Sequence, residues 1–215
     1  PQRGDLKLAQ AQYMLSQAHK HIQEVQRKYP EASVSVVFAG DMNSSPYSGI
    51  WELFKKGKLS LDIKEIQSWR TMISGQQIPE SRRQHFDIND CIDCLSKLNT
   101  FCNGEGKLCF QHNFELSSAY ENYSTLHKQI HNQTMEYPPS PLFHDDTYGE
   151  PRVTAITNGS NHSVDSIWFS KNSLELLNLL ELPQQNQLLS SHTPLPSPQH
   201  PSDHFILGAD LMIKG

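Results

Sequence analysis

The stretch VVFAGDMNSSPYSG, residues 36–49, joins an apolar run to a polar cluster and decides how the rest of the chain is interpreted. Residues 34–39 (VSVVFA) are mostly β-branched or aromatic, a composition typical of a strand covered on both faces. Asp41 and Asn43 follow at once, so a carboxylate and an amide stand at the end of this strand. Because a sheet can hold such groups in fixed positions, the stretch predicts a buried strand that ends at a polar site.

The segments on either side of this strand predict helices. Before it, residues 6–28 carry apolar side chains at alternating steps of three and four, which places them on one helical face. After it, Pro46 suits the first turn of a short helix, and Gly57 is a natural stop. A helix followed by a buried strand is half of a layered α/β unit, so we expect an α/β protein.

The remaining segments are predicted as strands or as irregular stretches. Strand patterns occupy residues 114–120, 150–159, 162–170 and 205–213, with NGSN as the turn between the second and third. Residues 173–182 fit either a strand or a helical turn. Residues 60–113 are poorly patterned and are interpreted as an insertion, while 121–146 and 183–202 are interpreted as loops.

Length and charge limit the classes of protein that fit. The 215 residues suffice for one domain with a hydrophobic core, and no stretch is apolar for long enough to span a membrane. The net charge of −5 argues against a large non-specific RNA-binding surface, because nucleic-acid binders often carry a basic excess. It does not argue against an enzyme that grips one or two phosphates through a metal ion.

Four cysteines crowd into the predicted insertion: Cys91, Cys94, Cys102 and Cys109. The first pair has the C-x-x-C spacing of zinc sites, but no second such pair follows. Reduced thiols in a surface insertion are the favoured interpretation, and a zinc site is the alternative.

Two further polar clusters lie beside predicted strands. Asp165 stands between apolar residues within one strand, and Asp203 and His204 directly precede the last. A buried carboxylate is costly unless a metal, a histidine or backbone donors neutralise it. Together with Asp41 and Asn43, these residues predict one shared polar site at the edge of a β-sandwich.

Such a set suits metal-assisted phosphoryl transfer. Carboxylate oxygens bind a cation of the magnesium type, an acid can deprotonate a water, and a histidinium can donate to a phosphate as negative charge builds. The simpler alternative is that Asp41 and Asn43 only form an Asx turn and that Asp203 only caps a strand.

The sequences GDMNSSP, SVDSIWFS and HPSDHF resemble, in this order, the last three signature blocks of the endonuclease/exonuclease/phosphatase superfamily. The resemblance runs from about residue 2 to 213 except for the insertion at about 60–113. It implies an α/β fold in which two β-sheets pack as a two-layer sandwich flanked by helices. It also implies that residues 1–215 form the C-terminal part of one catalytic domain, incomplete at the N-terminus.

Flanking sequences place the resemblance within the deadenylase-like group. RGDLKLAQAQYML (3–15) is similar to the Angel branch, and SSHTPLPSPQHPSDHF (190–205) to the 2′,5′-phosphodiesterase branch. This implies RNA 3′-end processing that depends on Mg2+, or alternatively on Mn2+. The implied activity is that of a 3′-exoribonuclease or deadenylase, a 2′,5′-phosphodiesterase or a 2′,3′-cyclic phosphatase. The implied substrate is an RNA 3′ end or oligoadenylate, and the implied partners are mRNA-decay or translation factors without a membrane. The implied location is intracellular: cytoplasmic, with mitochondrial as the alternative.

The resemblance also implies a role for each site residue. Asp41 resembles the acid that activates the attacking water and contacts the metal, and Asn43 the amide that supports it and contacts the phosphate. Asp165 resembles the acid that pairs with a histidine, and His204 the histidine that stabilises the phosphate in the transition state. Asp203 resembles an acid on the metal side.

One expected group has no counterpart in this sequence. The superfamily's main metal-binding Glu is expected to precede Pro1, and Glu24 lies on the predicted helix instead of at a strand end. The chain alone is therefore expected to bind metal weakly and to turn over substrate poorly.

Two other functions stay open. An inactive relative could use the same fold as an mRNA- or protein-binding module, although the intact set of Asp41, Asn43, Asp165 and His204 favours an enzyme. A DNA-repair nuclease or a lipid phosphatase would keep the superfamily but change the substrate, and the flanking sequences disfavour both.

Overall fold

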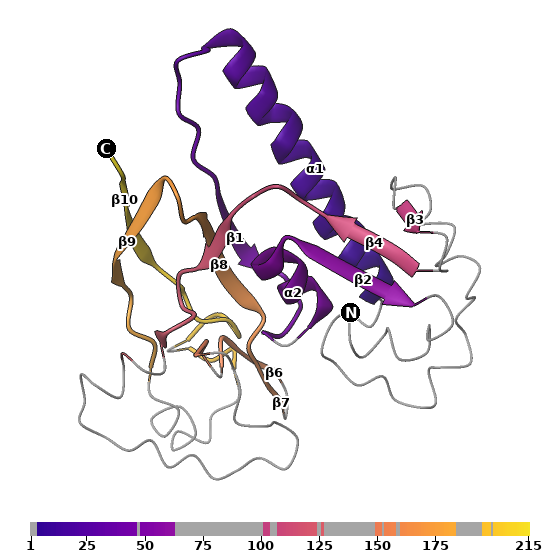
Figure 1. The fold of residues 1–215 in the computed structure, drawn as a ribbon. Coiled ribbons are helices and arrows are strands. Elements are labelled where there is room, and N and C mark those ends of the chain that lie inside the picture. The colour runs from indigo at the N-terminus through magenta and orange to yellow at the C-terminus, as the bar shows by residue number, and fades with distance from the viewer. Residues whose placement is uncertain are drawn as a thin grey trace.

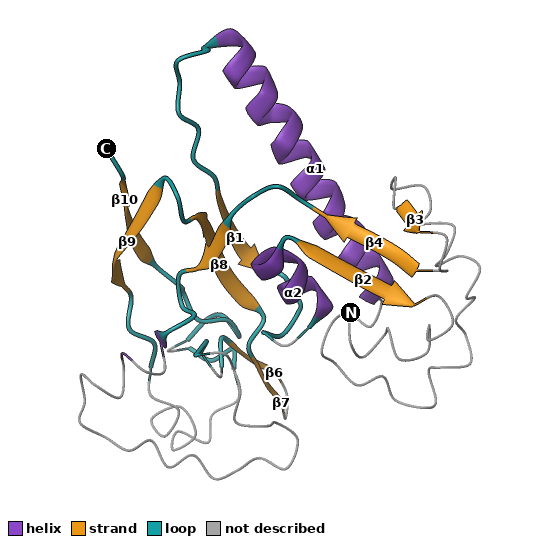
Figure 2. Cartoon of the chain, viewed as in Figure 1, coloured by secondary structure: helices purple, strands orange, loops and turns teal. Residues whose placement is uncertain are grey.

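The structure is a computed structural model in which helices and antiparallel sheets surround two hydrophobic clusters (Figures 1 and 2). It describes residues 4–46, 48–62, 101–103, 107–123, 126, 149–151, 153–157, 160–183, 195–198 and 200–215. None of the helices in these ranges is long and apolar enough to cross a membrane.

The first helix, α1 (Gly4–Lys28), confirms the helix predicted at residues 6–28. Leu8, Ala11 and Leu15 form its buried stripe and join the larger hydrophobic cluster. The C-terminal half of α1 is mostly exposed and extends beyond the sheets in Figure 1. The fully buried side chains of α1 therefore all lie in its first half.

The second helix, α2 (Gly49–Lys56), begins later than predicted. Its N-cap is Ser48, whose Oγ accepts a hydrogen bond from the Trp51 N–H at 3.2 Å. Pro46 precedes this cap, so its predicted place in the first helical turn was wrong. The predicted stop is confirmed, because Gly57 adopts a left-handed φ of 73° as the C-cap.

The central sheet is antiparallel, with the order β1-β8-β5. Its strands are β1 (Val37–Asp41), β8 (Asp165–Ser170) and β5 (Leu116–Ser118). The prediction that the first strand is covered on both faces was wrong: Phe38 is buried, but Val37 is 48% exposed. Successive side chains of a strand point to opposite faces, and in β1 only the face that carries Phe38 packs against the hydrophobic cluster.

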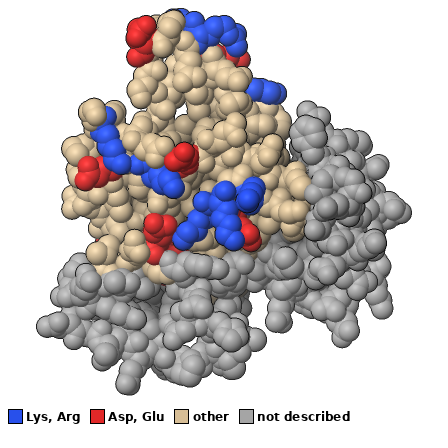
Figure 3. Space-filling view, in the orientation of Figure 1, with Lys and Arg blue, Asp and Glu red and all other residues tan. Residues whose placement is uncertain are grey.

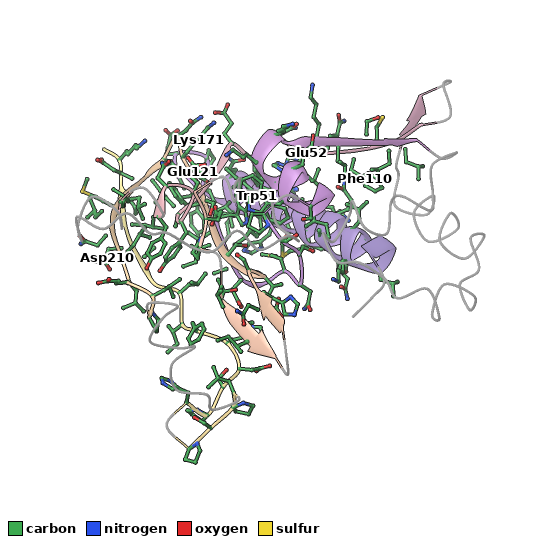
Figure 4. All side chains as sticks on the ribbon, turned by 90° about the horizontal axis from the view of Figure 1, so that it is seen from below. Trp51, Glu52, Phe110, Glu121, Lys171 and Asp210 are labelled. Carbon is green, nitrogen blue, oxygen red and sulfur yellow. The ribbon has the colours of Figure 1, made fainter. Side chains whose placement is uncertain are left out.

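Strand β8 separates the two hydrophobic clusters because successive side chains point to opposite faces. Trp168 belongs to the cluster with α1 and α2, whereas Ile167 and Phe169 belong to the other. That second cluster is shared with a two-stranded sheet of β9 (Leu174–Leu179) and β10 (Ala209–Ile213). The result is the predicted arrangement of two packed sheets with helices outside. Figure 4 shows Trp51 of α2 near the middle of the molecule.

The ends of the predicted insertion are regular structure, which corrects the interpretation of residues 60–113. Strands β2 (Lys58–Asp62), β4 (Lys107–Gln111) and β3 (Phe101–Asn103) form an antiparallel sheet in the order β2-β4-β3. Leu59, Leu61, Leu108 and Phe110 are buried in the first cluster. The strands were missed because each is only three to five residues long and because β2 pairs with β4 across a long intervening segment.

The structure describes only part of the cysteine-containing segment. Cys91 and Cys94 lie outside the described residues. Cys109 is a free thiol, and its Sγ lies 3.6 Å from the Ser60 Oγ. The zinc alternative therefore stays a prediction.

The last third of the chain differs from prediction in its strand boundaries. Residues Ala155–Thr157 form β6 and Ser160–His162 form β7, an antiparallel pair separate from β8, so the last two residues of the predicted NGSN turn lie in β7. The final strand begins at residue 209 and not at 205. Residues 203–208 therefore run without regular strand structure, apart from one bridge between Ala155 and His204. Residues 173–182 contain a strand, β9.

Glu150 is a buried carboxyl group between α2 and β5. Burial raises its pKa from an ordinary value of 4.5 to about 7, and the charge of Glu121 adds to this. A side-chain hydrogen bond with Ser118 and the charge of Lys55 oppose the increase. Because the folded protein holds this proton more tightly than the unfolded chain, the contribution of Glu150 to stability falls as pH rises from 4.5 to about 7.

We expect Glu150→Gln to remove this pH dependence, because glutamine is always neutral. The free energy of unfolding of the wild type should fall relative to that of the variant by up to ~3 kcal/mol between pH 5 and pH 8. Urea unfolding at both pH values measures the difference. Glu175→Gln, at an exposed position on β9, is the matched control and should behave as the wild type. An identical pH dependence in wild type and Glu150→Gln would contradict the prediction.

Candidate active site

The pairing of β1 with β8 brings the first two predicted acids together. Asp41, the last residue of β1, lies directly opposite Asp165, the first residue of β8. The pairing continues beyond the strands, where the Met42 N–H donates to the Val164 carbonyl at 2.9 Å. Like charges directly opposite each other destabilise a sheet, so each carboxylate requires partners of its own.

Asn43 supplies the partners of Asp41. Its backbone N–H donates to Asp41 Oδ1 at 2.6 Å, and its side-chain Nδ2 donates to Asp41 Oδ2 at 2.9 Å. Asn43 has a φ of 49°, a left-handed conformation that asparagine adopts more readily than most residues. The Asx turn of the simpler interpretation is thus present, and it holds both oxygens of the exposed Asp41 carboxylate in place.

His204 supplies the partner of Asp165. Its Nδ1 lies 2.9 Å from Asp165 Oδ2 and 3.2 Å from Oδ1. The side chain of Asp165 is only 14% exposed, whereas that of His204 is 33% exposed. The hydrogen bond to Nδ1 orients the ring, so that Nε2 is the nitrogen available to other groups.

The surroundings of His204 favour its protonated form. Burial lowers the pKa of its imidazole, but the hydrogen bond and charge of Asp165 raise it, and the charges of Asp41 and Asp203 raise it further. The net result is a pKa above the ordinary histidine value. The structure thus brings all five predicted residues to one end of the central sheet, while their individual roles stay predictions.

Lys7 of α1 is a member of this region that the sequence analysis missed. Its side chain is buried, and its Nζ donates a hydrogen bond to the backbone carbonyl of Asn43. Burial lowers the pKa of Lys7, and the charge of Asp41 opposes this. Its position on the apolar face, one residue before Leu8, was the available signal, because a lysine there needs a polar partner.

The Asp41 carboxylate could supply part of the oxygen ligands of a magnesium ion. Mg2+ is commonly held by one or two carboxylates together with waters and substrate phosphates. Each Asp41 oxygen accepts one hydrogen bond from Asn43, and a carboxylate oxygen has capacity for a further ligand. In the part of the chain that the structure describes, no group of three His, Cys, Asp or Glu side chains is placed to hold a metal alone.

We compared the chain with known proteins by sequence and by structure. No family model matches the chain. It is 26% identical over 212 residues to carbon catabolite repressor protein 4 homolog 5 of Arabidopsis thaliana, covering 98% of this chain and 43% of that protein. It is 26% identical over 218 residues to 2′,5′-phosphodiesterase 12 of Mus musculus, covering 100% of this chain and 24% of that protein.

A solved structure is similar in fold as well as in sequence. The crystal structure of ANGEL2, a 2′,3′-cyclic phosphatase, in complex with adenosine-2′,3′-vanadate, matches with a TM-score of 0.61 and 26% identity. The match covers 98% of this chain and 53% of that one. The chain has the endonuclease/exonuclease/phosphatase fold. The resemblance to deadenylase-like members of that superfamily, predicted from the motifs, is confirmed. The chain spans about half or less of the length of these relatives.

The contact between Asp165 and His204 predicts a measurable change in proton affinity. We expect Asp165→Asn to lower the pKa of the His204 imidazole, because the variant removes both the carboxylate charge and a strong acceptor. An NMR titration of the ring protons between pH 5 and 9 measures the pKa, with the resonance assigned by its absence in His204→Gln.

Asp210→Asn is the matched control, because Asp210 lies on β10 at the edge of the molecule in Figure 4. It should leave the His204 pKa unchanged. A His204 pKa equal in wild type and Asp165→Asn would mean that the two side chains do not form the pair described.

Proposed function

We propose that the protein is a metal-dependent phosphoesterase that acts on RNA 3′ ends. The observation that carries the proposal is the facing pair of Asp41, held by Asn43, and Asp165, held to His204, at one end of a sheet. An exposed carboxylate and a histidine with raised pKa form an acid–base pair of the kind that phosphate-ester hydrolysis requires.

Asp41 is the group that accepts a proton from the attacking water. Its two bonds to Asn43 fix the carboxylate plane, so the side chain loses little freedom when the substrate arrives. The hydrogen bond from Lys7 to the Asn43 carbonyl supports the same turn from the side of α1. Asp41 therefore acts from a position fixed before the substrate binds.

His204 is the group that stabilises the developing negative charge. Its Nδ1 is engaged with Asp165, and its imidazolium directs Nε2–H to a phosphate oxygen. The raised pKa extends the protonated form to higher pH, and activity that depends on it should fall as pH rises through that pKa.

A divalent cation, Mg2+ or Mn2+, would be held by Asp41 with Asp203 on the same side, and it would supply Lewis-acid stabilisation of the phosphate oxygens. Among the three RNA-end chemistries, 2′,3′-cyclic phosphate hydrolysis ranks first. ANGEL2, described as a 2′,3′-cyclic phosphatase, is the structural relative that supports this order. Deadenylation and 2′,5′-phosphodiester cleavage are the second candidates, and the similarity to 2′,5′-phosphodiesterase 12 supports the latter.

The charge of the surface suits recognition of an RNA end better than a long RNA footprint. On the face shown in Figure 3, Lys and Arg side chains lie among Asp and Glu side chains in small groups. The net charge of the chain is −5. Association with mRNA-decay or translation factors, and a cytoplasmic or mitochondrial location, are further parts of this proposal.

The test uses the full-length protein with Mg2+ and three labelled RNAs, which end in a 2′,3′-cyclic phosphate, a 3′ poly(A) tail or a 2′,5′-linked tail. We expect hydrolysis of the cyclic phosphate. Asp41→Ala and His204→Ala should each lower kcat by about 10²- to 10⁴-fold, because they remove the base and the charge-stabilising donor. Asp210→Ala is the control: it removes a carboxylate from β10, and the variant should keep full activity.

The outcomes separate the candidates. Cleavage of another RNA with the same loss in both variants would change the substrate but keep the mechanism. Full activity in either variant would remove the role assigned to that residue. If no RNA is hydrolysed and calorimetry detects no Mg2+ binding, the enzyme hypothesis is wrong. The alternative, an inactive relative that binds mRNA or protein, then takes its place.

A further inference from the structure

Thr154 is a buried polar residue at the centre of the candidate site that none of the three motifs contains. It directly precedes β6 and is 0% exposed. A buried hydroxyl group is costly unless it forms hydrogen bonds, so the partners of this side chain indicate what it does.

The hydroxyl oxygen of Thr154 binds the main chain of the Asp165 segment. Thr154 Oγ1 accepts hydrogen bonds from the backbone N–H of Val164 at 2.9 Å and of Asp165 at 3.0 Å. A hydroxyl oxygen has two acceptor positions, and these two bonds fill both. The N–H of Asp165 belongs to the residue whose carboxylate holds His204, so the Thr154 side chain fixes the backbone from which that carboxylate projects.

The backbone of Thr154 binds the His204 segment as well as the strand before Asp165. Its N–H donates to the His162 carbonyl at 2.7 Å, and its carbonyl accepts from the Phe205 N–H at 2.8 Å. The next residue, Ala155, forms the only strand-like bridge to His204 in the described part of the chain. The two members of the Asp165–His204 pair are 39 residues apart in sequence, and Thr154 bonds to the main chain on both sides.

We propose that Thr154 is a positioning residue that sets the distance and orientation of the Asp165–His204 pair. It acts through the main chain and touches neither the substrate nor the imidazole. The inference rests on the proposed function for its effect on rate, but its effect on the Asp165–His204 hydrogen bond can be measured without any substrate.

Two substitutions separate the hydroxyl from the backbone contacts. Thr154→Val keeps the shape and both backbone bonds but removes the acceptor of two N–H groups. Thr154→Ser keeps the acceptor and loses only a methyl group. A role in positioning therefore predicts opposite results for the two variants, whereas a role in packing alone predicts that valine is the milder change.

The first experiment is NMR spectroscopy of the substrate-free protein. The Nδ1–H proton of His204 should give a downfield signal because of its bond to Asp165, and Asp165→Asn identifies the signal by its loss. We expect the signal to persist in Thr154→Ser and to weaken or shift in Thr154→Val. In the same samples, the amides of Val164 and Asp165 should exchange with solvent faster in Thr154→Val.

The second experiment is steady-state kinetics of the full-length protein on the RNA it hydrolyses. We expect Thr154→Val to lower kcat by about 10- to 100-fold with little change in KM, the size expected for misplaced catalytic groups. Thr154→Ser should stay within about threefold of the wild type, since it retains both hydrogen bonds.

Ser118→Ala is the matched control, because Ser118 is also a buried hydroxyl on the central sheet, opposite Trp168 of β8. It should reduce stability towards urea and leave the His204 signal unchanged. If Thr154→Val does not fold, Thr154→Ala removes the same acceptor with less buried bulk and takes its place.

Each outcome decides the proposal. An unchanged His204 signal in a folded Thr154→Val or Thr154→Ala would overturn it, and so would equal loss of the signal in Thr154→Ser. If the wild type hydrolyses none of the RNAs, the proposed function fails, while the NMR comparison still decides whether Thr154 positions the pair.

Discussion

The antiparallel pairing of β1 with β8 is the constraint on which the candidate site depends. It sets Asp41 opposite Asp165, a placement that costs energy unless both carboxylates are bound by donors. The register is fixed by packing, because Trp168 and Phe38 must face the same hydrophobic cluster. A shift by one residue would turn these side chains to the wrong face and separate the acids. The core therefore determines the geometry of the site.

The two carboxylates are stabilised in different ways, and this difference gives them different chemistry. Asp41 is exposed and bound by neutral donors of Asn43, so it keeps capacity for a proton or a cation. Asp165 is mostly buried and bound to His204, so its charge serves the imidazole.

The sequence predicted those parts of the site whose signals are local. Asp41 and Asn43 lie two residues apart after an apolar run, and His204 follows Asp203 directly. Lys7 was not predicted, because its partner lies 36 positions away along the chain. Thr154 was not predicted, because its hydroxyl bonds to N–H groups 10 and 11 positions away and no short motif contains both ends of those bonds. Strand β2 was missed for the same reason as Lys7, since its pairing with β4 across a long gap leaves no local pattern. Strand β3 pairs with β4 close by in the sequence but is only three residues long.

The balance of charge at the site agrees with the proposed role of a divalent cation. Three carboxylates, Asp41, Asp165 and Asp203, meet there with one histidinium and one buried lysine. Even with both bases protonated, the described residues leave a net negative charge where the proposal puts a phosphate. Burial lowers the pKa of Lys7, and the charge of Asp41 opposes this. Added positive charge would favour phosphate binding beside these acids, and a divalent ion held by Asp41, as proposed, would supply it.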